Sequence, residues 1–330
     1  MNVVKAALIF GLLVILSACG GGSMNEQEIT EESEEVIFER NTEFRGPWIR
    51  VFVETDDGRE LSVNSNDNAV ETNVYPNVVP NHQTRRWRLE KVDADGSSYI
   101  IAVVSWDPND TDDYLIAGWW AHFNEEEPPN LTYQNLSEFA IIDGPEFDPL
   151  IVPELELPTS GTASYNGPAG GTYLYVPGST LDQGLFVEDG WEATVNLTTN
   201  FKSRTIEGCI GCSGDLTKID ALIPSGRGNV SVDISDYELH LKTTRYDDFG
   251  TSETGIIEVH HPDRNSVSVA TDGAGWQAIL SNRPDMDENP RLIGGFVSTL
   301  FEEQDNSLGS FFGTYVALSE AFENTRKPSP

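Results

Sequence analysis

The sequence predicts an all-β protein, in which an N-terminal β-rich domain precedes an eight-stranded antiparallel β-barrel. Residues 48–54, "WIRVFVE", alternate apolar and polar side chains, and residues 191–199 and 230–234 repeat this alternation, which is typical of half-buried strands. No long segment keeps a helical period, and "ALSEAFENTR" near the C-terminus predicts one short helix at most. Loops rich in Gly, Pro, Asp and Asn separate the other apolar runs, which lie at residues 98–106, 113–123, 255–261, 275–280, 292–300 and 309–318.

The N-terminus has the pattern of an export signal that ends in a lipid-attachment site. Lys5 supplies one positive charge, and residues 6–16 form an apolar run that is too short to span a bilayer as a mature helix. The following "LSAC" resembles the bacterial lipobox, which implies that residues 1–18 are removed and that Cys19 is acylated. The alternative is an ordinary secretory signal with a chance cysteine. The sequence thus predicts a lipoprotein whose acyl chains anchor Cys19 in a membrane.

The rest of the chain divides into a tether and two domains. Residues 19–45 begin with glycines and continue into a glutamate-rich run with little apolar content, so we expect an acidic, flexible tether. The β-rich domain then covers residues 46–157, and the barrel domain covers residues 158–330, with about eight strand candidates to close it. The boundary is placed by prolines that would interrupt a strand ladder: Pro128, Pro129, Pro145, Pro149, Pro153 and Pro158.

The charge excludes one class of partner. The chain carries 54 acidic and 20 basic residues, a formal net charge of -34 at pH 7. Binding to nucleic acid needs clustered Lys and Arg, so we exclude it. The acidity either keeps the protein soluble or attracts a basic partner, and the sequence leaves both interpretations open.

The cysteine pair in "GCIGCSGD" has three competing interpretations. A zinc site would need two further ligands, for which His240, His260 and His261 are the candidates near in sequence. A thioredoxin-like redox motif would need a helix N-terminus, but the surrounding pattern is that of strands and turns. We predict the third interpretation, a local disulfide between Cys209 and Cys212 at a hairpin tip, and no metal or cofactor.

Four segments together resemble one family of bacterial lipoproteins, those built on the transferrin-binding-protein-B β-barrel. The most specific motifs are the Gly-x-Ala-x-Tyr-x-Gly opening of the first segment and the Gly-x-Phe and Gly-x-Phe-x-Gly pair of the last. We expect these glycines to allow sharp coiling of the strands, and aromatic side chains to fill the space that they leave. The segments are "GTASYNGPAGGTYLY" (161–175), "ATVNLTTNFKSRTIEG" (193–208), "RLIGGFVSTLFEEQDNSLGSFFGTY" (291–315) and "DYLIAGWW" (113–120).

The resemblance implies a lobe made of a β-rich handle domain followed by the barrel, and this chain has room for one such lobe. It also implies an outer-membrane, lipid-anchored protein displayed at the cell surface by a dedicated surface-assembly translocon. Such a protein would bind a host or environmental protein or solute, in iron, haem or nutrient acquisition, beside a TonB-dependent receptor. Transferrin itself is not expected, because two-lobed members bind it largely through a first lobe that a single-lobed chain cannot supply.

We expect binding rather than catalysis. No Gly-x-Ser-x-Gly motif announces a serine hydrolase, and no carboxylate pair stands out among the acidic residues. The acidic stretches 107–113 and 285–289 lack the Gly and distal Glu of a calcium loop, which favours acidic turns. As ligand-binding residues we predict Arg245, Tyr246 and Phe249, because interfaces favour such amphipathic groups.

Two alternative functions stay open. One is a periplasm-facing structural lipoprotein with the same anchor. The other is a carbohydrate-binding or adhesive module, in which Trp120 or Trp276 would stack on a sugar.

Overall fold

The structure is a computed structural model, and it confirms the all-β class. It describes residues 39–45, 48–54, 60–64, 70–72, 79–93, 96–123, 136–148, 152–179, 187–219, 232–264, 266–268 and 274–325. The predicted signal peptide, Cys19 and the first part of the predicted tether lie outside these residues. No helix among the described residues is long and apolar enough to cross a membrane.

The chain begins with a three-stranded antiparallel sheet, in the order β1-β2-β3. The strands are β1 (Glu39–Arg45), β2 (Trp48–Glu54) and β3 (Glu60–Asn64). The first of these corrects the predicted tether of residues 19–45, because Glu39 to Arg45 pair in register with β2 from Glu54 to Trp48. Low apolar content did not reveal this strand, since the pairing uses backbone groups that every residue carries.

A second sheet of five antiparallel strands follows, in the order β4-β5-β6-β7-β8. A short 3-10 helix, η3 (Pro145–Phe147), follows it, and the predicted boundary at residue 157 falls between η3 and the next strand. The strands are β4 (Val70–Thr72), β5 (Gln83–Asp93), β6 (Gly96–Asp107), β7 (Asp110–Phe123) and β8 (Leu136–Asp143).

The third sheet, which we call the C-terminal sheet, has ten strands, two more than the predicted eight. Short strands account for the difference, because β12 and β15 have three residues each and pair only at the ends of longer neighbours. The helix α1 (Glu320–Glu323) ends the described chain. The strands are β9 (Thr162–Val176), β10 (Val187–Asn200), β11 (Thr205–Ile210), β12 (Thr217–Ile219), β13 (Glu238–Arg245), β14 (Ile257–His260), β15 (Ser266–Ser268), β16 (Gly275–Leu280), β17 (Leu292–Glu303) and β18 (Leu308–Ser319).

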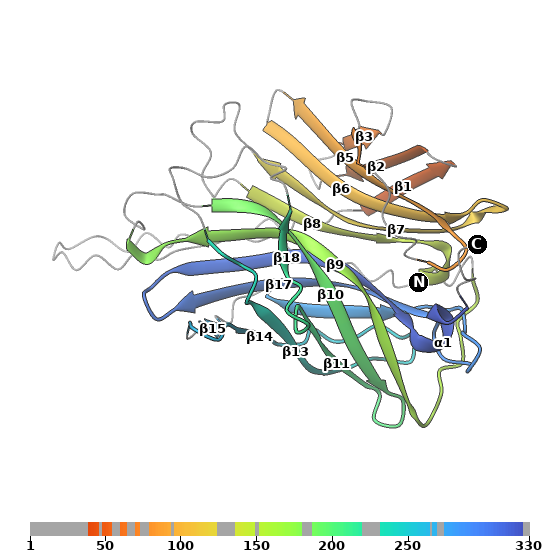
Figure 1. Ribbon diagram of the computed structural model, residues 1–330. Helices are drawn as coiled ribbons and strands as arrows, with labels where there is room; N and C mark the ends of the chain where they lie inside the picture. The colour runs from red at the N-terminus through yellow and green to blue at the C-terminus, as the bar shows by residue number, and fades with distance from the viewer. Residues whose placement is uncertain are drawn as a thin grey trace, which may run out of the picture.

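The C-terminal sheet curls so that its two sides meet (Figure 1). The path β14-β13-β11-β10-β9-β18-β17 ends with β16 paired to β17. The amide of Ser252 donates to Ala278 in β16, and the amide of Glu253 donates to Arg245 in β13. Backbone hydrogen bonds therefore continue from β17 through β16 and the 251–255 segment to β13.

Glycines allow the tight coiling that the sequence predicted at two places. Gly171 in β9 faces Gly313 in β18, and a Cβ on either would collide with the backbone of the other strand. Gly295 lies beneath the Tyr315 ring, whose hydroxyl occupies the space of the missing side chain. The expectation that aromatic residues fill glycine gaps is confirmed at this position.

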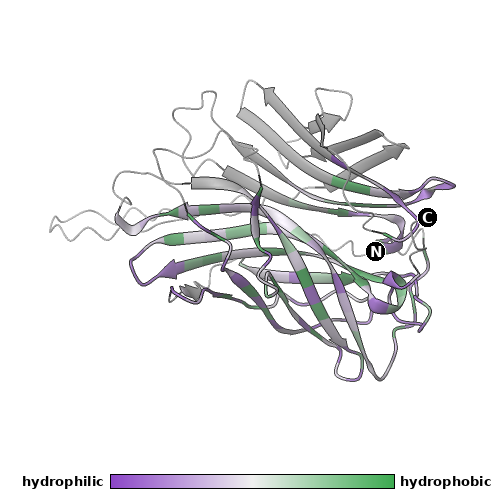
Figure 2. Cartoon of the chain, in the orientation of Figure 1, coloured by the Kyte–Doolittle hydropathy of each residue, from purple (hydrophilic) through white to green (hydrophobic). Residues whose placement is uncertain are grey.

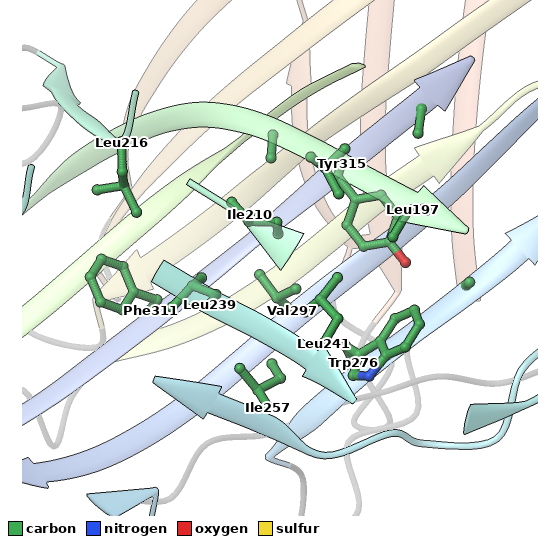
Figure 3. Close-up of a cluster of buried hydrophobic side chains, with 14 of the residues drawn as sticks. Leu197, Ile210, Leu216, Leu239, Leu241, Ile257, Trp276, Val297, Phe311 and Tyr315 are labelled. Atoms are coloured by element: carbon green, nitrogen blue, oxygen red, sulfur yellow. The ribbon is translucent and has the colours of Figure 1, made fainter. Parts of the chain in front are cut away.

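The interior of the curled sheet is packed with side chains from nearly every strand. Buried and exposed residues alternate in the second half of β10, whereas β17 and β18 are buried along almost their whole length. Hydrophobic and hydrophilic residues are interspersed along the strands (Figure 2), and the labelled apolar side chains of several strands gather in one cluster (Figure 3). The Trp191 indole is fully buried and donates to the carbonyls of Thr172 (2.8 Å) and Phe312 (3.1 Å), so its one polar atom is satisfied. The core includes Leu197, Ile210, Leu239, Leu241, Ile257, Trp276, Val297, Phe311 and Tyr315.

A buried ionic cluster joins the five-stranded sheet to the C-terminal sheet. Glu146 of η3 is 1% exposed, and the Arg291 guanidinium binds its carboxylate in a bidentate fashion, at 2.9 and 3.0 Å. The same guanidinium lies 3.2 Å from Asp113 of β7, which also pairs with Arg283 and lies 3.5 Å from the His82 imidazole. We call these five residues the junction cluster. The paired residues are far apart in the sequence: 31 positions separate His82 from Asp113, and 178 positions separate Asp113 from Arg291.

Opposite charges in the junction cluster offset the effect of burial on Asp113 and Arg291. Burial by itself would raise the pKa of Asp113, but the hydrogen bond with His82 and the charges of Arg291 and Arg283 outweigh it, so its pKa lies well below the usual value. Burial would likewise lower the pKa of Arg291, but Glu146 and Asp113 raise it. Because the pKa of Asp113 is depressed in the folded state, its stabilising contribution is complete above the ordinary carboxyl pKa and declines as the pH falls.

Apolar side chains complete the junction beside the ionic cluster. Val79, before β5, and Leu115 of β7 pack with Leu292, Val316 and Leu318 of the C-terminal sheet. All five are buried, so the faces of the two sheets are held together by apolar contact as well as by charge.

We expect Arg291→Met to lower the free energy of unfolding by about 3–5 kcal/mol, because it leaves the buried Glu146 carboxylate without its cationic partner and removes one of the two guanidinium partners of Asp113. Equilibrium denaturation in urea measures the change. The matched control is Arg204→Met, which removes an ion pair with Asp248 whose side chains are 54% and 72% exposed. That loss should stay below about 1 kcal/mol. Equal losses in the two variants would contradict the role assigned to the cluster.

Candidate binding surface

One end of the C-terminal sheet carries two ordered loops with exposed apolar tips. The first joins β13 to β14 and contains Phe249, which is 64% exposed. The second joins β16 to β17 and contains Met286, which is 70% exposed. Large exposed apolar side chains on loops are informative when the loops themselves are held in place, because they cannot fold back to bury themselves.

The first loop is held by Asp247. Its carboxylate accepts hydrogen bonds from the amides of Phe249 (3.0 Å) and Thr251 (2.9 Å). Its backbone amide donates to Thr251, and Gly250, in the left-handed region at φ 76°, turns the chain back. An exposed ion pair between Arg204 and Asp248 ties the loop to the β10–β11 turn. The Phe249 ring is therefore presented on a pre-organised turn.

The second loop repeats this arrangement. The Asp285 carboxylate accepts from the amides of Asp287 (2.8 Å) and Asn289 (3.0 Å), and the Asp285 amide donates to Asn289. Glu288 adopts a left-handed conformation at φ 63°, which closes the turn. The predicted acidic turn at 285–289 is thus an ordered turn, held by hydrogen bonds to Asp285, that leaves Met286 exposed.

The two loops meet over the same part of the core. The carbonyl of Gly250 accepts a hydrogen bond from the amide of Leu280, the last residue of β16. The first loop therefore contacts the chain where the second loop leaves β16. Beneath them, Tyr165 and Tyr246 belong to the buried core, and burial raises the pKa of Tyr165 well above its usual range. We call Phe249, Met286 and the two turns that hold them the loop face.

The three predicted binding residues divide into two groups. Arg245 and Phe249 are exposed, and they lie in β13 and in the loop that follows it. Tyr246 is 4% exposed and belongs to the core, so its prediction as a binding residue is wrong. Alternation along β13 explains the error, because neighbours at the strand end point to opposite faces. Burial raises the pKa of Tyr246 to about 12.

The opposite end of the C-terminal sheet is closed by polar contacts. Glu303, at the end of β17, is buried and accepts hydrogen bonds from the hydroxyls of Tyr175 (2.7 Å) and Tyr237. The Arg264 guanidinium lies 3.4 Å from the same carboxylate and against both tyrosine rings. Burial is the main reason that the pKa of Tyr175 rises to about 12. These groups satisfy one another and offer no open donor set for a ligand.

A small cavity lies between the five-stranded sheet and the C-terminal sheet. Its walls include Leu115 and Trp119 from β7 and Pro168 and Gly170 from β9, and its volume is about 70 Å³. Pockets for small organic ligands usually enclose about 300–1,000 Å³. This cavity accommodates a few water molecules at most.

Cys209 and Cys212 are joined by a disulfide in the structure, with their Cα atoms 5.9 Å apart. Cys209 lies in β11 and Cys212 in the turn that follows it, away from any helix N-terminus in the described part of the chain. Of the three histidines considered with this pair, His240 comes close, with its Nε2 3.7 Å from the Cys212 sulfur. His260 and His261 face opposite ways, as their alternation predicted: the first packs on His240 and the second on Tyr237.

One of the two tryptophan candidates for sugar stacking is not available at the surface. Trp276 is fully buried, and its indole nitrogen donates to the carbonyl of Lys242 at 3.1 Å. Gly255, which pairs with Trp276 across the sheet, leaves room for the indole ring, because a Cβ at this position would collide with it. Nothing in the sequence indicated this contact. Trp119 is also buried, and the side chain of Trp120 lies outside the described residues.

No protein-family model matches the chain, and no curated protein matches its sequence. The assignment of function therefore depends on the residues and on their arrangement.

Sequence reasoning missed two parts of this arrangement. Met286 was overlooked because residues 285–289 were predicted as an acidic turn with no binding role, although Asp at 285 and Asn at 289 are typical of a turn that side-chain hydrogen bonds hold in shape. The pairing of Glu146 with Arg291 had no signal, because 145 residues separate them.

We expect Asp247→Ala to loosen the first loop without unfolding the protein, because it removes the two side-chain hydrogen bonds that hold Phe249 and Thr251. Amide hydrogen exchange at these two residues should accelerate at least about tenfold, the equivalent of about 1.4 kcal/mol of local stability, in line with the loss of one or two hydrogen bonds. Asp248→Ala, which removes only the exposed contact with Arg204, is the control and should leave both rates nearly unchanged. Similar rates in both variants would show that Asp247 does not order the loop.

Proposed function

We propose that this protein is a non-catalytic binding protein of the bacterial outer membrane. In this proposal, acyl chains on Cys19 anchor it, the chain between Cys19 and β1 extends it from the membrane, and the loop face binds an extracellular protein or solute. It would belong with the single-lobed lipoproteins of the transferrin-binding-protein-B-like family, displayed by a surface-assembly translocon. The motif resemblance and the glycine and aromatic packing of β9, β17 and β18 support this family.

The observation that carries the binding proposal is the pair of rigid, exposed apolar tips at Phe249 and Met286. A pre-organised loop loses little conformational entropy when a partner docks, so more of the contact energy appears as affinity. Aromatic residues and Met are enriched in protein interfaces, and charged groups are concentrated at the rim. Here Asp248, Asp287 and Arg204 provide such a rim.

Surface binding is favoured over binding inside the sheet. The described interior is filled by side chains such as Trp191, Phe311 and Tyr315, and the cavity at the junction is far below the size of a haem or of another large cofactor. A partner that is itself a macromolecule, or a solute held between loops, fits the exposed tips better.

Among the alternatives, the carbohydrate-binding module loses one of its two stacking candidates, because Trp276 is buried. A periplasm-facing structural lipoprotein would share the fold and the anchor and differ in exposure to the medium.

The proposal is tested by site-specific photo-crosslinking on intact cells. A benzophenone side chain replaces Phe249 in one strain and Ile256 in another. Ile256 is the matched control, because it is also apolar and 69% exposed but lies directly before β14, outside the turns at residues 247–251 and 285–289. We expect the label at 249, and not at 256, to capture a discrete component of the growth medium or host fluid.

Protease treatment of the same cells separates the two parts of the proposal. Degradation before permeabilisation is expected for a surface protein. Protection until permeabilisation would assign the protein to the periplasmic side, and degradation with identical adducts at 249 and 256 would reject the loop face while keeping surface display.

A further inference from the structure

The cysteine pair lies at the edge of a larger group of metal-ligating side chains. Cys209 pairs directly with His240 across β11 and β13, and His240 pairs with Glu258 across β13 and β14. His260, two residues further along β14, pairs with Glu238. Because side chains at paired and alternate positions share a face, these groups all project from the outer face of the sheet.

The distances among three of these side chains match a ligand set. One ligand atom each from Cys209, Cys212 and His240 lies within 4.8 Å of the other two. The His260 ring packs against the His240 ring with 4.3 Å between centroids, so a second imidazole is at hand from the neighbouring strand. Two sulfurs and two imidazoles form the donor set that Zn²⁺ prefers in tetrahedral sites.

The backbone conformation of the turn that carries the two cysteines brings their sulfurs together. Gly211 and Gly214 are both in the left-handed region, at φ 79° and 69°, and the amide of Gly214 donates to the carbonyl of Gly211. Gly211 is anchored by its own amide, which donates to Thr194 in β10 at 3.0 Å. The backbone therefore holds both cysteines in place whether or not a bond joins them.

Acidic groups orient the two imidazoles. The Glu238 carboxylate lies 2.8 Å from His240 Nε2, and the Glu258 carboxylate lies 3.4 Å from His260 Nε2. Lys242 also binds Glu258, at 2.8 Å, so this carboxylate has a partner of its own. A metal bound at Nε2 would replace the contact with Glu238, and the carboxylates would remain beside the site as outer-shell groups.

We propose that Cys209, Cys212, His240 and His260 form a redox-gated site for Zn²⁺, closed by the disulfide and opened by its reduction. This function is additional to binding at the loop face, which lies at a different part of the C-terminal sheet. The metal would cross-link the turn after β11 to β13 and β14.

The gating step is a thiol–disulfide exchange with a reductant of the dithiol class. One thiolate of the reductant attacks a protein sulfur to form a mixed disulfide, and its second thiol displaces that sulfur. The reductant leaves as its own disulfide, and the protein disulfide gains two electrons and two protons. Zn²⁺ then displaces the two thiol protons, which are released to solvent. In the reverse direction the ion leaves, the two thiolates take up protons, and exchange with a disulfide of the same class re-forms the protein disulfide and reduces that disulfide to the dithiol.

The test uses the full chain in mild detergent with Cys19→Ser, so that Cys209 and Cys212 are the only thiols among its three cysteines. Bound Zn²⁺ is measured after dialysis, with and without a phosphine reductant. We expect one ion per reduced chain and none per oxidised chain. Equal amounts in the two states would overturn the proposal.

Histidine variants assign the ligands. Loss of an outer-shell partner commonly lowers metal affinity about 10- to 100-fold, so His240→Ala should cost at least about 100-fold in a competition titration, and His260→Ala at least about tenfold. The matched control is His261→Ala, which removes an imidazole next in sequence that packs on Tyr237 instead, and its affinity should be unchanged. Unchanged affinity in His240→Ala would also overturn the site.

A third measurement needs no histidine variant. X-ray absorption of the reduced, zinc-loaded protein should show two sulfur ligands at about 2.3 Å and two nitrogen ligands at about 2.0–2.1 Å. A shell without sulfur would reject the proposal.

Discussion

The rest of the structure depends on the junction cluster, in which Arg291 is held between Glu146 and Asp113. An unpaired charge at this depth would be strongly unfavourable, so each group requires the others to be present. The consequence is geometric as well as energetic. The bidentate Arg291 guanidinium holds η3 against the start of β17. It thereby helps to position the five-stranded sheet on β17 and β18.

The same cluster links the two sheets to the loop face. Ser281 and Arg283, which contact Glu146 and Asp113, lie in the segment that continues to Asp285 and Met286. The second loop therefore grows out of the junction, while the first is fastened to β16 at Gly250 and Leu280. Both exposed tips are thus carried by chain segments whose other ends are fixed in the core or in the junction, which is the condition for a rigid binding surface.

The sequence predicted much of what depends on local pattern and missed the contacts that depend on long-range pairing. Alternation correctly indicated β2, β10 and the opposite directions of His260 and His261, and the glycine motifs correctly indicated close strand contact at Gly295. The prediction of a strand at residues 230–234 is wrong, because residues 232–234 form no strand. Two misses have local causes: the strand at residues 39–45 pairs with the next strand, β2, but its low apolar content hid it, and alternation alone did not show which face of β13 is buried at Tyr246. The extra short strands β12 and β15 depend on partners that are not their neighbours in the chain. The junction cluster lies beyond sequence reasoning for the same reason, because an acidic chain offers Arg291 many carboxylates and only folding selects Glu146.

The most direct test of this account is differential scanning calorimetry of the intact protein at neutral pH. If the junction cluster joins the two sheets into one body, unfolding should occur in a single transition, with equal calorimetric and van't Hoff enthalpies. Two separate transitions, one for the five-stranded sheet and one for the C-terminal sheet, would contradict the claim that the cluster holds the structure together.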